Sequence, residues 1–480
     1  MDARRCTSLE KTTDLNLSRI VEHWANHCPS RVALHFEGED WTYAELWRRI
    51  EDATRALQVA RGERIAWLGY NHPDMLVLLF AAARRGAMLV PLNWRLTAAE
   101  HRAILSDCQS RWLFSDADFS GAARDLGTPV GSLDADMASA PIGTDDDELL
   151  IVYTSGTTGR PKGAVLSQAA LLYNGYNSIH AHDLGQADHV LSTLPLFHVG
   201  GLNNQTVPAL LAGATVTLHK RFEPAAWLHD VQSRKPTLSL LVPATMQAVI
   251  GHQAWAGCNL SSLRLIHTGS MVVPESLIRA FHERGVPVGQ IYGATETAPI
   301  ATVLRREDAL RKVGSAGKAA LHCDVKLADG EILVRGPNVM RRYWNDPAAT
   351  SQALDSDGWF RTGDLARLDE DGFFWIMGRL KDVIISGGEN IYPAELENVM
   401  ADCPAIAEAA VIGVADAKWG EAACAVVVRK VGAAIDEATV LALFRDRLAR
   451  YKHPRRVVFA DTLPKNALGK VQKHELKKMI

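Results

Sequence analysis

One short segment combines glycines, hydroxyl side chains and a lysine in a way that fits a polyphosphate. It reads YTSGTTGRPKG from residue 153 and follows an apolar run. Glycines allow tight turns that aim backbone N–H groups inward, the hydroxyls add donors, and the lysine adds positive charge. The segment is not a Walker A loop, since no GxxxxGK[ST] pattern is present. The residues predicted to hold phosphate are Thr154, Ser155, Gly156, Thr157, Thr158, Gly159 and Lys162.

The spacing in this loop is more specific than its composition. A flexible surface turn is the ordinary interpretation of a lone Gly/Ser/Thr loop. However, its fixed positions, at about 6% usage each, would match by chance with a probability of about 10⁻⁷. The segment resembles the signature loop of the adenylate-forming superfamily, which includes acyl-CoA synthetases, luciferases and the adenylation domains of peptide synthetases. The resemblance covers essentially the whole chain, and further motifs follow in the family's order.

The resemblance implies an adenine and magnesium site in the segment YGATET. Tyr292, followed by Gly293, offers a flat face for the adenine ring. Thr295 can hydrogen-bond the α-phosphate, and Glu296 is a hard oxygen ligand that suits Mg²⁺. Gly269, in a Thr-Gly-Ser triplet, would line the adenine pocket, where the family usually has Gly-Gly-Ala or a similar small triplet. A capped helix start is the structural alternative for the Thr-Glu pair.

Two later segments resemble the family's ribose site and the boundary between its domains. Asp364, in WFRTGD, would accept hydrogen bonds from both ribose hydroxyls. Arg379, in GRLKD, is a further candidate for ribose or phosphate contact. Lys381 falls at the family's hinge, where a few residues absorb a large backbone rotation. Gly387 and Gly388 fall where the family lets the pantetheine arm of CoA pass close to the backbone.

The last motif carries the candidate catalytic lysine. The segment PKNALGK, which ends at Lys470, resembles the loop whose lysine bridges the carboxylate and the α-phosphate as charge builds. The surrounding tail is basic throughout, and a basic run is usually a solvated face. Only the PxxxxGK spacing distinguishes Lys470 from its neighbours.

The resemblance places the acyl site near His198, in LPLFHVGG. The matching histidine of the family packs by the bound carboxylate and gates access for the thiol. Val199 and Gly200 are small where many aryl-specific relatives carry a bulky residue, which favours an extended acyl chain. Asn203, with Asn204 beside it, could instead face a polar or phenolic group. We therefore expect a fatty acid as substrate, with a coumarate- or ferulate-type aromatic acid as the alternative.

Together these motifs imply an ATP-dependent carboxylate–CoA ligase. Its small-molecule carboxylic acid would attack Mg·ATP to form an acyl-adenylate and pyrophosphate, and CoA would then displace AMP. ATP, Mg²⁺ and CoA are the implied cofactor and co-substrates. The pattern is closest to bacterial fatty acyl-CoA synthetases and to coumarate or ferulate CoA ligases. A stand-alone adenylation enzyme that loads a carrier protein and a catalytically silent binding protein are the alternatives.

The elements that must position these motifs follow an α/β pattern. Short apolar strands alternate with helices through the first three-quarters of the chain, which is typical of a layered architecture. The phosphate loop should lead into a helix near Ser167, and closely spaced glycines after Gly314 predict a β-rich subdomain. A late helix is expected at Glu437–Leu448. We expect a large N-terminal ATP- and acyl-binding domain, a hinge and a small mobile α+β domain with the catalytic lysine, at residues 1–378, 379–382 and 383–480.

The composition sets outer limits on the function. The 480 residues include 52 Lys and Arg against 55 Asp and Glu, so the total charge gives no indication of a nucleic-acid partner. No stretch is long and apolar enough for a transmembrane segment, and the first residues lack the apolar core of a signal peptide. The 7 scattered cysteines have no CxxC spacing, which fits a cytoplasmic protein with reduced thiols. The oligomeric state cannot be inferred from these features.

Overall fold

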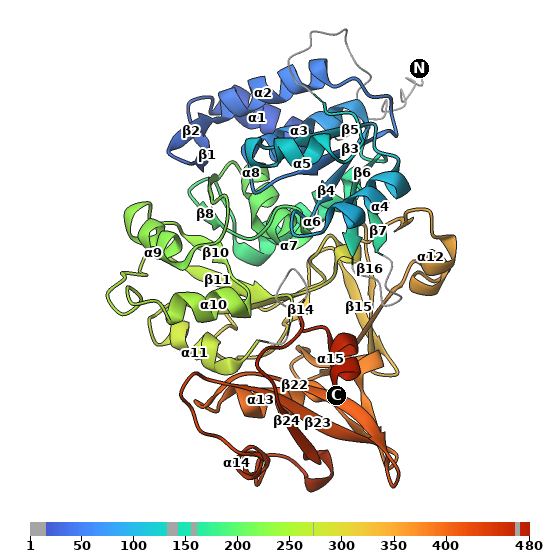
Figure 1. Cartoon of the computed structure of the whole chain (residues 1–480). Helices are drawn as coiled ribbons and strands as arrows, with labels where there is room; N and C mark the ends of the chain where they lie inside the picture. Colours follow the sequence, from blue (N-terminus) through green and yellow to red (C-terminus); the bar gives the residue numbers. More distant parts are fainter. Residues whose placement is uncertain (1–15, 132–142, 155–160, 272, 466–470) are drawn as a thin grey trace, which may run out of the picture.

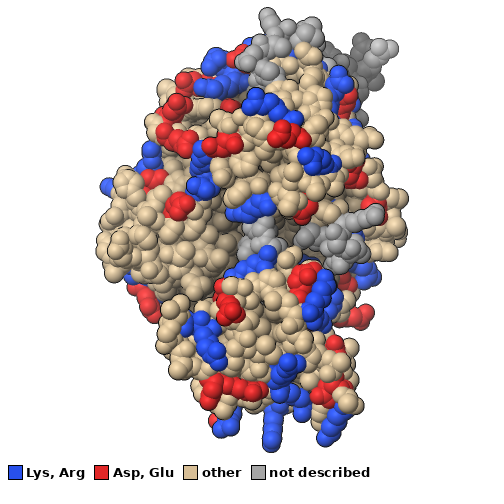
Figure 2. All heavy atoms as spheres, in the orientation of Figure 1, with Lys and Arg blue, Asp and Glu red and all other residues tan. Residues whose placement is uncertain are grey.

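The computed structural model describes residues 16–131, 143–154, 161–271, 273–465 and 471–480. Figure 1 shows a large N-terminal body and, below it, a smaller C-terminal domain built around β22, β23 and β24. The α/β class expected from the sequence is confirmed. Figure 2 shows Lys and Arg interspersed with Asp and Glu on the face drawn. Within the described ranges, no helix has both the length and the apolar character needed to cross a bilayer.

A six-stranded sheet carries the predicted phosphate loop. Its order is β17-β7-β6-β4-β3-β5, and β6 and β7 form an antiparallel hairpin on either side of that loop. The loop therefore connects two strands, and α6 begins only after β7, capped by the Ser167 hydroxyl. The helix expected near Ser167 is confirmed, and the short buried run 163–166 that precedes it pairs with β6. The strands are β3 (Arg64–Leu68), β4 (Met88–Leu92), β5 (Trp112–Ser115), β6 (Glu148–Thr154), β7 (Lys162–Ser167) and β17 (Arg342–Tyr343).

Helix α3 (Pro73–Arg85) shows how local sequence builds the core of this body. Pro73 occupies its first turn, the His72 side chain caps it, and Gly86 ends it with φ of 64°. Side chains from Met75 to Ala83 are buried, as expected for a helix that is apolar on all sides. The other helices of four or more residues in the body are α1 (Ser18–His27), α2 (Tyr43–Ala56), α4 (Ala98–Cys108), α5 (Ser120–Arg124), α6 (Gln168–His182), α8 (Val207–Leu211), α9 (Pro224–Ser233), α10 (Pro243–Ile250), α11 (Glu275–His282) and α12 (Pro347–Ala353).

A nine-stranded sheet of order β14-β13-β12-β11-β10-β8-β9-β1-β2 carries the adenine candidates. Strands β8, β10, β11 and β12 are parallel, so their carboxyl ends meet at one edge. Ligands of open α/β sheets bind outside these ends. Gly269 ends β11 and Tyr292 ends β12, which places both at that edge. The strands are β1 (Val32–Phe36), β2 (Glu39–Thr42), β8 (His189–Ser192), β9 (Thr215–Leu218), β10 (Leu238–Leu240), β11 (Leu265–Gly269), β12 (Val288–Tyr292), β13 (Thr302–Val303) and β14 (Lys318–Ala319).

The β-rich segment predicted after Gly314 includes an antiparallel four-stranded sheet of order β15-β16-β18-β19. The register of its last two strands sets Asp364 directly opposite Arg379. Two ribose candidates that are distant in sequence are thereby neighbours. The strands are β15 (Asp324–Ala328), β16 (Glu331–Arg335), β18 (Phe360–Leu368) and β19 (Phe374–Arg379).

The C-terminal domain is a five-stranded sheet with its own apolar core. Its late helix is shorter than expected, since α14 ends at Ala442 and Asp446 adopts a left-handed backbone with φ of 60°. The chain therefore turns where a continuous helix was predicted. The elements are β20 (Ile384–Ser386), β21 (Glu389–Ile391), α13 (Pro393–Ala401), β22 (Ile406–Asp416), β23 (Gly420–Arg429), α14 (Glu437–Ala442), β24 (Arg456–Phe459) and α15 (Lys473–Met479).

Candidate active site

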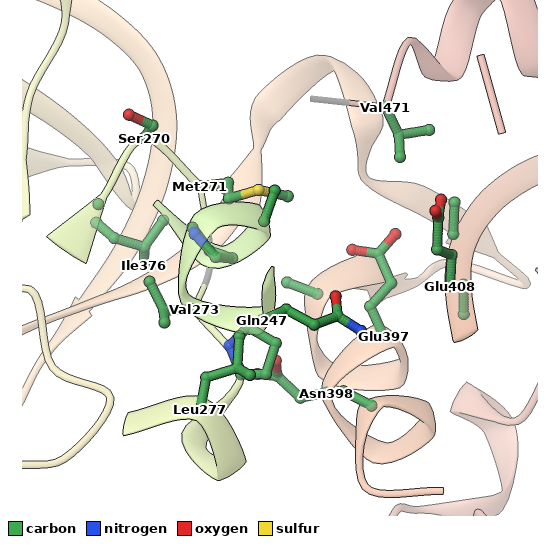
Figure 3. Close-up of a pocket in the computed structure, with 18 of the residues that line it drawn as sticks. Gln247, Ser270, Met271, Val273, Leu277, Ile376, Glu397, Asn398, Glu408 and Val471 are labelled. Atoms are coloured by element: carbon green, nitrogen blue, oxygen red, sulfur yellow. The ribbon is translucent and has the colours of Figure 1, made fainter. Parts of the chain in front are cut away.

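A cavity of about 670 Å³ lies between the N-terminal body and the C-terminal domain. Figure 3 shows Gln247 and Leu277 on one wall and Glu397, Asn398 and Glu408 on the other. This volume is within the usual range of small-molecule sites. The predicted nucleotide-binding residues that line the cavity are Gly269, Tyr292, Gly293, Asp364 and Arg379.

Asp364 is the centre of the ribose-binding candidates. The Tyr292 hydroxyl donates a hydrogen bond to Asp364 Oδ2 at 2.9 Å, and Arg379 Nε forms an ion pair with Asp364 Oδ1 at 2.7 Å. Burial, followed by the charge of Asp364, raises the pKa of Tyr292, so its hydroxyl stays protonated and remains a donor. Each carboxylate oxygen keeps a further lone pair, which leaves Asp364 able to accept from ribose hydroxyls while it is held in place.

Glycine is required by close backbone contacts at the adenine pocket. A Cβ on Gly269 would lie 2.3 Å from the Ile291 carbonyl oxygen, and a Cβ on Gly293 would lie 1.6 Å from the Pro299 carbonyl oxygen. Neither contact is possible for a larger residue without movement of the backbone. Ser270, the last residue of the Thr-Gly-Ser triplet, has φ of 71°, a conformation that favours glycine.

Thr295 and Glu296 lie in η3 (Thr295–Thr297), a 3₁₀ helix of one turn. The Met340 N–H donates to the Glu296 carbonyl oxygen at 2.7 Å, and the Tyr343 hydroxyl donates to Glu296 Oε1 at 2.6 Å. Sequence analysis missed Tyr343, because no local signal connects it with a carboxylate 47 residues away. Neither Thr295 nor Glu296 lines the 670 Å³ cavity.

The phosphate loop is only partly within the described residues. Thr154 and Lys162 lie at its two ends, where the Thr154 hydroxyl donates to the Lys162 carbonyl oxygen at 3.3 Å. The Lys162 ammonium lies 5.3 Å from the centre of the Tyr343 ring. The other predicted phosphate ligands lie outside the described residues: Ser155, Gly156, Thr157, Thr158 and Gly159.

His198 is held as a neutral imidazole. Its Nδ1 accepts a hydrogen bond from the Gly200 N–H at 3.1 Å and caps the short helix α7 (Val199–Gly201). Burial lowers the pKa of His198 to about 4. A neutral ring with Nδ1 as acceptor carries its proton on Nε2. The side chain can therefore donate one hydrogen bond without adding charge.

Three consecutive carboxamides follow His198 in the π-helical turn η2 (Leu202–Thr206). Their backbone is fixed to α6, since Asn174 Nδ2 donates to the Asn203 carbonyl oxygen at 2.7 Å and the Ser178 hydroxyl donates to that of Asn204. Both polar atoms of the Asn203 side chain and Oδ1 of Asn204 are buried without a hydrogen-bond partner among the described residues. Asn204 Nδ2 lies 3.9 Å from the position a Cβ of Gly200 would take, which places this side chain beside His198.

Comparison with known proteins assigns the family. The model for AMP-binding enzymes matches residues 21–344, and that for the AMP-binding enzyme C-terminal domain matches residues 395–470. The chain belongs to the AMP-binding enzymes. It is an adenylate-forming acid–thiol ligase, and ATP and CoA fit this family as its substrates.

The most similar relatives are named for different acids. Indoleacetate–CoA ligase of Aromatoleum aromaticum is 48% identical and covers 97% of this chain and 98% of its own length. Feruloyl-CoA synthase of Amycolatopsis is 43% identical, covering 95% of this chain and 97% of its own length. A long-chain-fatty-acid–CoA ligase of Mycobacterium tuberculosis is 36% identical, covering 91% and 92%. The o-succinylbenzoate CoA synthetase of Bacillus subtilis in complex with its acyl-adenylate superposes with a TM-score of 0.88 at 32% identity, covering 97% of this chain and 98% of its own.

These relatives correct the expectation of a fatty acid substrate, since the two with the higher identity are named for aromatic acids. The structure gives a physical reason why the small residues were misleading. A Cβ on Gly200 would lie 3.2 Å from His198 Nδ1 and 3.9 Å from Asn204 Nδ2, so these neighbours explain the glycine and it is no evidence for an acyl chain. The fatty acid preference is therefore not supported, and the aromatic alternative fits better.

The C-terminal wall of the cavity is formed by α13, β22 and the flanks of the segment predicted to carry the catalytic lysine. Lys465 and Val471 flank that segment, form an isolated β-bridge and line the cavity together with Lys473. Lys470 itself lies outside the described residues. Lys381, Gly387 and Gly388 do not line the cavity.

Of the two predicted CoA-site glycines, Gly387 sits against Trp419, whereas a Cβ on Gly388 would meet nothing within 4 Å. The Gly387 N–H donates to the Trp419 carbonyl oxygen at 2.8 Å, and a Cβ on Gly387 would lie 2.6 Å from the indole ring. Lys381 is exposed in the 3₁₀ turn η4 (Leu380–Asp382), between the N-terminal body and β20. The cavity therefore brings together the adenine and ribose candidates and the flanks of the lysine segment. Lys381, the CoA candidates, the described phosphate candidates Thr154 and Lys162, Thr295, Glu296 and the acyl-site candidates from His198 to Asn203 do not line it.

Proposed function

We propose that this enzyme is an AMP-forming CoA ligase for an aromatic carboxylic acid whose ring carries a hydrogen-bond donor, such as an indole N–H or a phenolic O–H. The observation that carries the proposal is the Asn204 side chain near His198, whose Oδ1 is buried without a hydrogen-bond partner among the described residues. An unpaired buried acceptor is costly, and a ring donor would satisfy it. The names of the relatives at 48% and 43% identity support the same class of acid.

In the first half-reaction, a carboxylate oxygen of the acid attacks the α-phosphorus of ATP and the bond to the β-phosphate breaks. Tyr292 and the glycine-lined edge hold the adenine, and Asp364 with Arg379 holds the ribose. Lys162 and the loop after Thr154 orient the departing pyrophosphate, and Lys470 stabilises the charge that builds on the α-phosphoryl oxygens. Positioning and electrostatics supply the rate in such phosphoryl chemistry.

Glu296 fits a Mg²⁺ site. Its Oε1 accepts from Tyr343, while no hydrogen bond or ion pair from another described residue reaches its second oxygen. A half-buried carboxylate oxygen of this kind is a suitable ligand for a cation that retains most of its water. Mg²⁺, when bound, offsets charge on the phosphate oxygens. Thr295, in the same turn, is placed to hydrogen-bond the α-phosphate.

In the second half-reaction, the CoA sulfur attacks the acyl carbonyl carbon, the bond to AMP breaks, and the thiol proton is released. We propose that residues 1–378 and 383–480 act as two domains that rotate about Lys381. The rotation would carry Lys470 away and bring Gly387 and Gly388 to the pantetheine arm. His198, which is neutral, would lie beside the carboxyl group of the acid without taking its proton.

The test is acid-dependent pyrophosphate release with Mg·ATP and CoA. The panel pairs acids that share a shape but differ in the ring donor, namely indole-3-acetate with 1-naphthylacetate and coumarate with cinnamate, and adds fatty acids of rising length. We expect turnover with an aromatic acid and preference for the donor-bearing member of its pair. A smooth optimum among the fatty acids would overturn the substrate class while leaving the ligase assignment intact.

A further inference from the structure

Tyr343 contacts two parts of the phosphate-binding machinery that are far apart in sequence. Its hydroxyl donates to Glu296 Oε1 at 2.6 Å, and its ring lies 5.3 Å from the Lys162 ammonium. The side chain is 8% exposed, so water competes little for either contact. One tyrosine therefore connects the carboxylate proposed to hold the metal with a lysine proposed to face the β- and γ-phosphates.

The backbone fixes where this tyrosine lies. Strand β17 pairs with β7, which sets Tyr343 opposite Ala164, two residues from Lys162. The next N–H, that of Trp344, donates to the Gly163 carbonyl oxygen at 2.7 Å. The Tyr343 N–H is held by the Thr350 hydroxyl at 3.0 Å. The backbone that carries the Tyr343 ring is therefore fixed to β7, the strand that follows the phosphate loop.

The hydrogen bond between Tyr343 and Glu296 runs in one direction, because an ionised carboxylate can only accept and the tyrosine hydroxyl is therefore the donor. A permanent donor on Oε1 orients the carboxylate and leaves the other oxygen for a ligand. Partners that orient a metal-binding side chain in this way commonly affect metal affinity by about 10- to 100-fold.

We propose that Tyr343 is a positioning residue that orients Glu296 toward the divalent cation of Mg·ATP and couples that orientation to the strand carrying Lys162. The proposal rests on the metal-binding role given to Glu296 in the proposed function. The proposal gives β17, the edge strand of the six-stranded sheet, a role in nucleotide binding.

The test measures metal retention directly, without turnover. Full-length protein is titrated with Mn²⁺ in the presence of α,β-methylene-ATP, whose α–β bond cannot be cleaved, and free Mn²⁺ is followed by its electron paramagnetic resonance signal. The proteins compared are the wild type, Tyr343→Phe, Glu296→Gln, the double variant and Tyr43→Phe. Tyr43→Phe is the matched control, because it removes a buried hydroxyl bonded to the Ala214 carbonyl oxygen at 2.7 Å, away from the cavity-lining residues.

We expect Tyr343→Phe to weaken Mn²⁺ retention by about 10-fold or more, with analogue binding in EDTA unchanged. The change should be absent in the Glu296→Gln background, because the tyrosine acts through that carboxylate. Wild-type retention by Tyr343→Phe, or an equal loss of analogue binding in EDTA, would overturn the proposal. If Glu296→Gln itself retains Mn²⁺ normally, the metal role of Glu296 fails instead, which separates the two failures.

Discussion

At the scale of single residues, the proposed acyl site contains buried polar atoms that have no hydrogen-bond partner among the described residues. Asn204 is 7% exposed and its Oδ1 has no partner among the described residues, while its backbone carbonyl is fixed by Ser178. The carboxamide is therefore held in place with an acceptor available. Such sites discriminate strongly against analogues that lack the matching donor, since the buried polar group is then left unsatisfied.

Asn204→Leu should test this role, because leucine has nearly the same shape and no acceptor. We expect kcat/KM for the preferred donor-bearing acid to fall by about 10-fold or more, with little change for its donor-free partner in the acid pair. Gln205→Leu is the neighbouring comparison, because Gln205 Nε2 donates to the Ser239 carbonyl oxygen at 3.4 Å while its Oε1 is also buried without a partner among the described residues. A donor-dependent loss in Asn204→Leu alone would assign the acceptor to Asn204. An equal loss with both members of the pair would indicate a purely structural role for Asn204.

At the scale of elements, two ion pairs flank the catalytic-lysine segment. Lys465 pairs with Glu408 of β22, and Lys473 of α15 pairs with Glu397 of α13, each at 2.7 Å. Glu397 Oε1 also accepts from the Val411 N–H at 2.9 Å, which ties the helix to the sheet. Both ends of the segment are thereby fixed to the wall of the cavity.

Lys473→Met should consequently impair adenylation more than thioester formation. We expect pyrophosphate release to fall by about 10-fold, because small displacements of a charge-stabilising group cost rate steeply. Formation of acyl-CoA from supplied acyl-adenylate should be unchanged. Lys470→Ala should show the same selectivity with a larger loss, and Lys478→Met, on the same helix but paired with Glu475, should show neither effect. Equal losses in both half-reactions would contradict the assignment.

At the scale of the whole molecule, buried histidines make the fold sensitive to acid. Burial lowers the pKa of His182, His189 and His198 to about 4, and that of His267 well below its ordinary 6.5. Below that ordinary value, the unfolded chain binds protons that the folded chain excludes. The free energy of unfolding should therefore fall as the pH drops from about 6.5 toward about 4.

Urea denaturation at about pH 7 and about pH 5 checks this expectation. The wild type should lose stability at the lower pH. His189→Gln, which keeps a polar partner for the Thr217 hydroxyl that now lies 2.7 Å from His189 Nε2, should lose less. An identical loss in both proteins would mean that His189 does not contribute to the acid sensitivity.

The sequence alone determined the family and the α/β class, and it predicted which residues bind the nucleotide. These features depend on backbone conformation and side-chain chemistry within a few positions, as in the glycine-rich loop and in Gly293, where a Cβ would lie 1.6 Å from a carbonyl oxygen. Two predictions from local patterns were wrong. The helix expected at Glu437–Leu448 is interrupted by a turn at Asp446. The fatty acid expected from the small Gly200 is not supported by the relatives.

Only the tertiary structure decided which distant residues act on one another. Tyr292 and Asp364 are 72 residues apart, and Tyr343 and Glu296 are 47 apart. No local sequence pattern therefore predicts that either pair is in contact. The register of β18 with β19 sets Asp364 opposite Arg379, and that of β17 with β7 sets Tyr343 opposite Ala164. Their partners, Tyr292 at the end of β12 and Glu296 in η3, come from outside those strand pairs. The physical reason is that strand pairing is set by burial across whole sheets, and side-chain contacts between sheets follow from it.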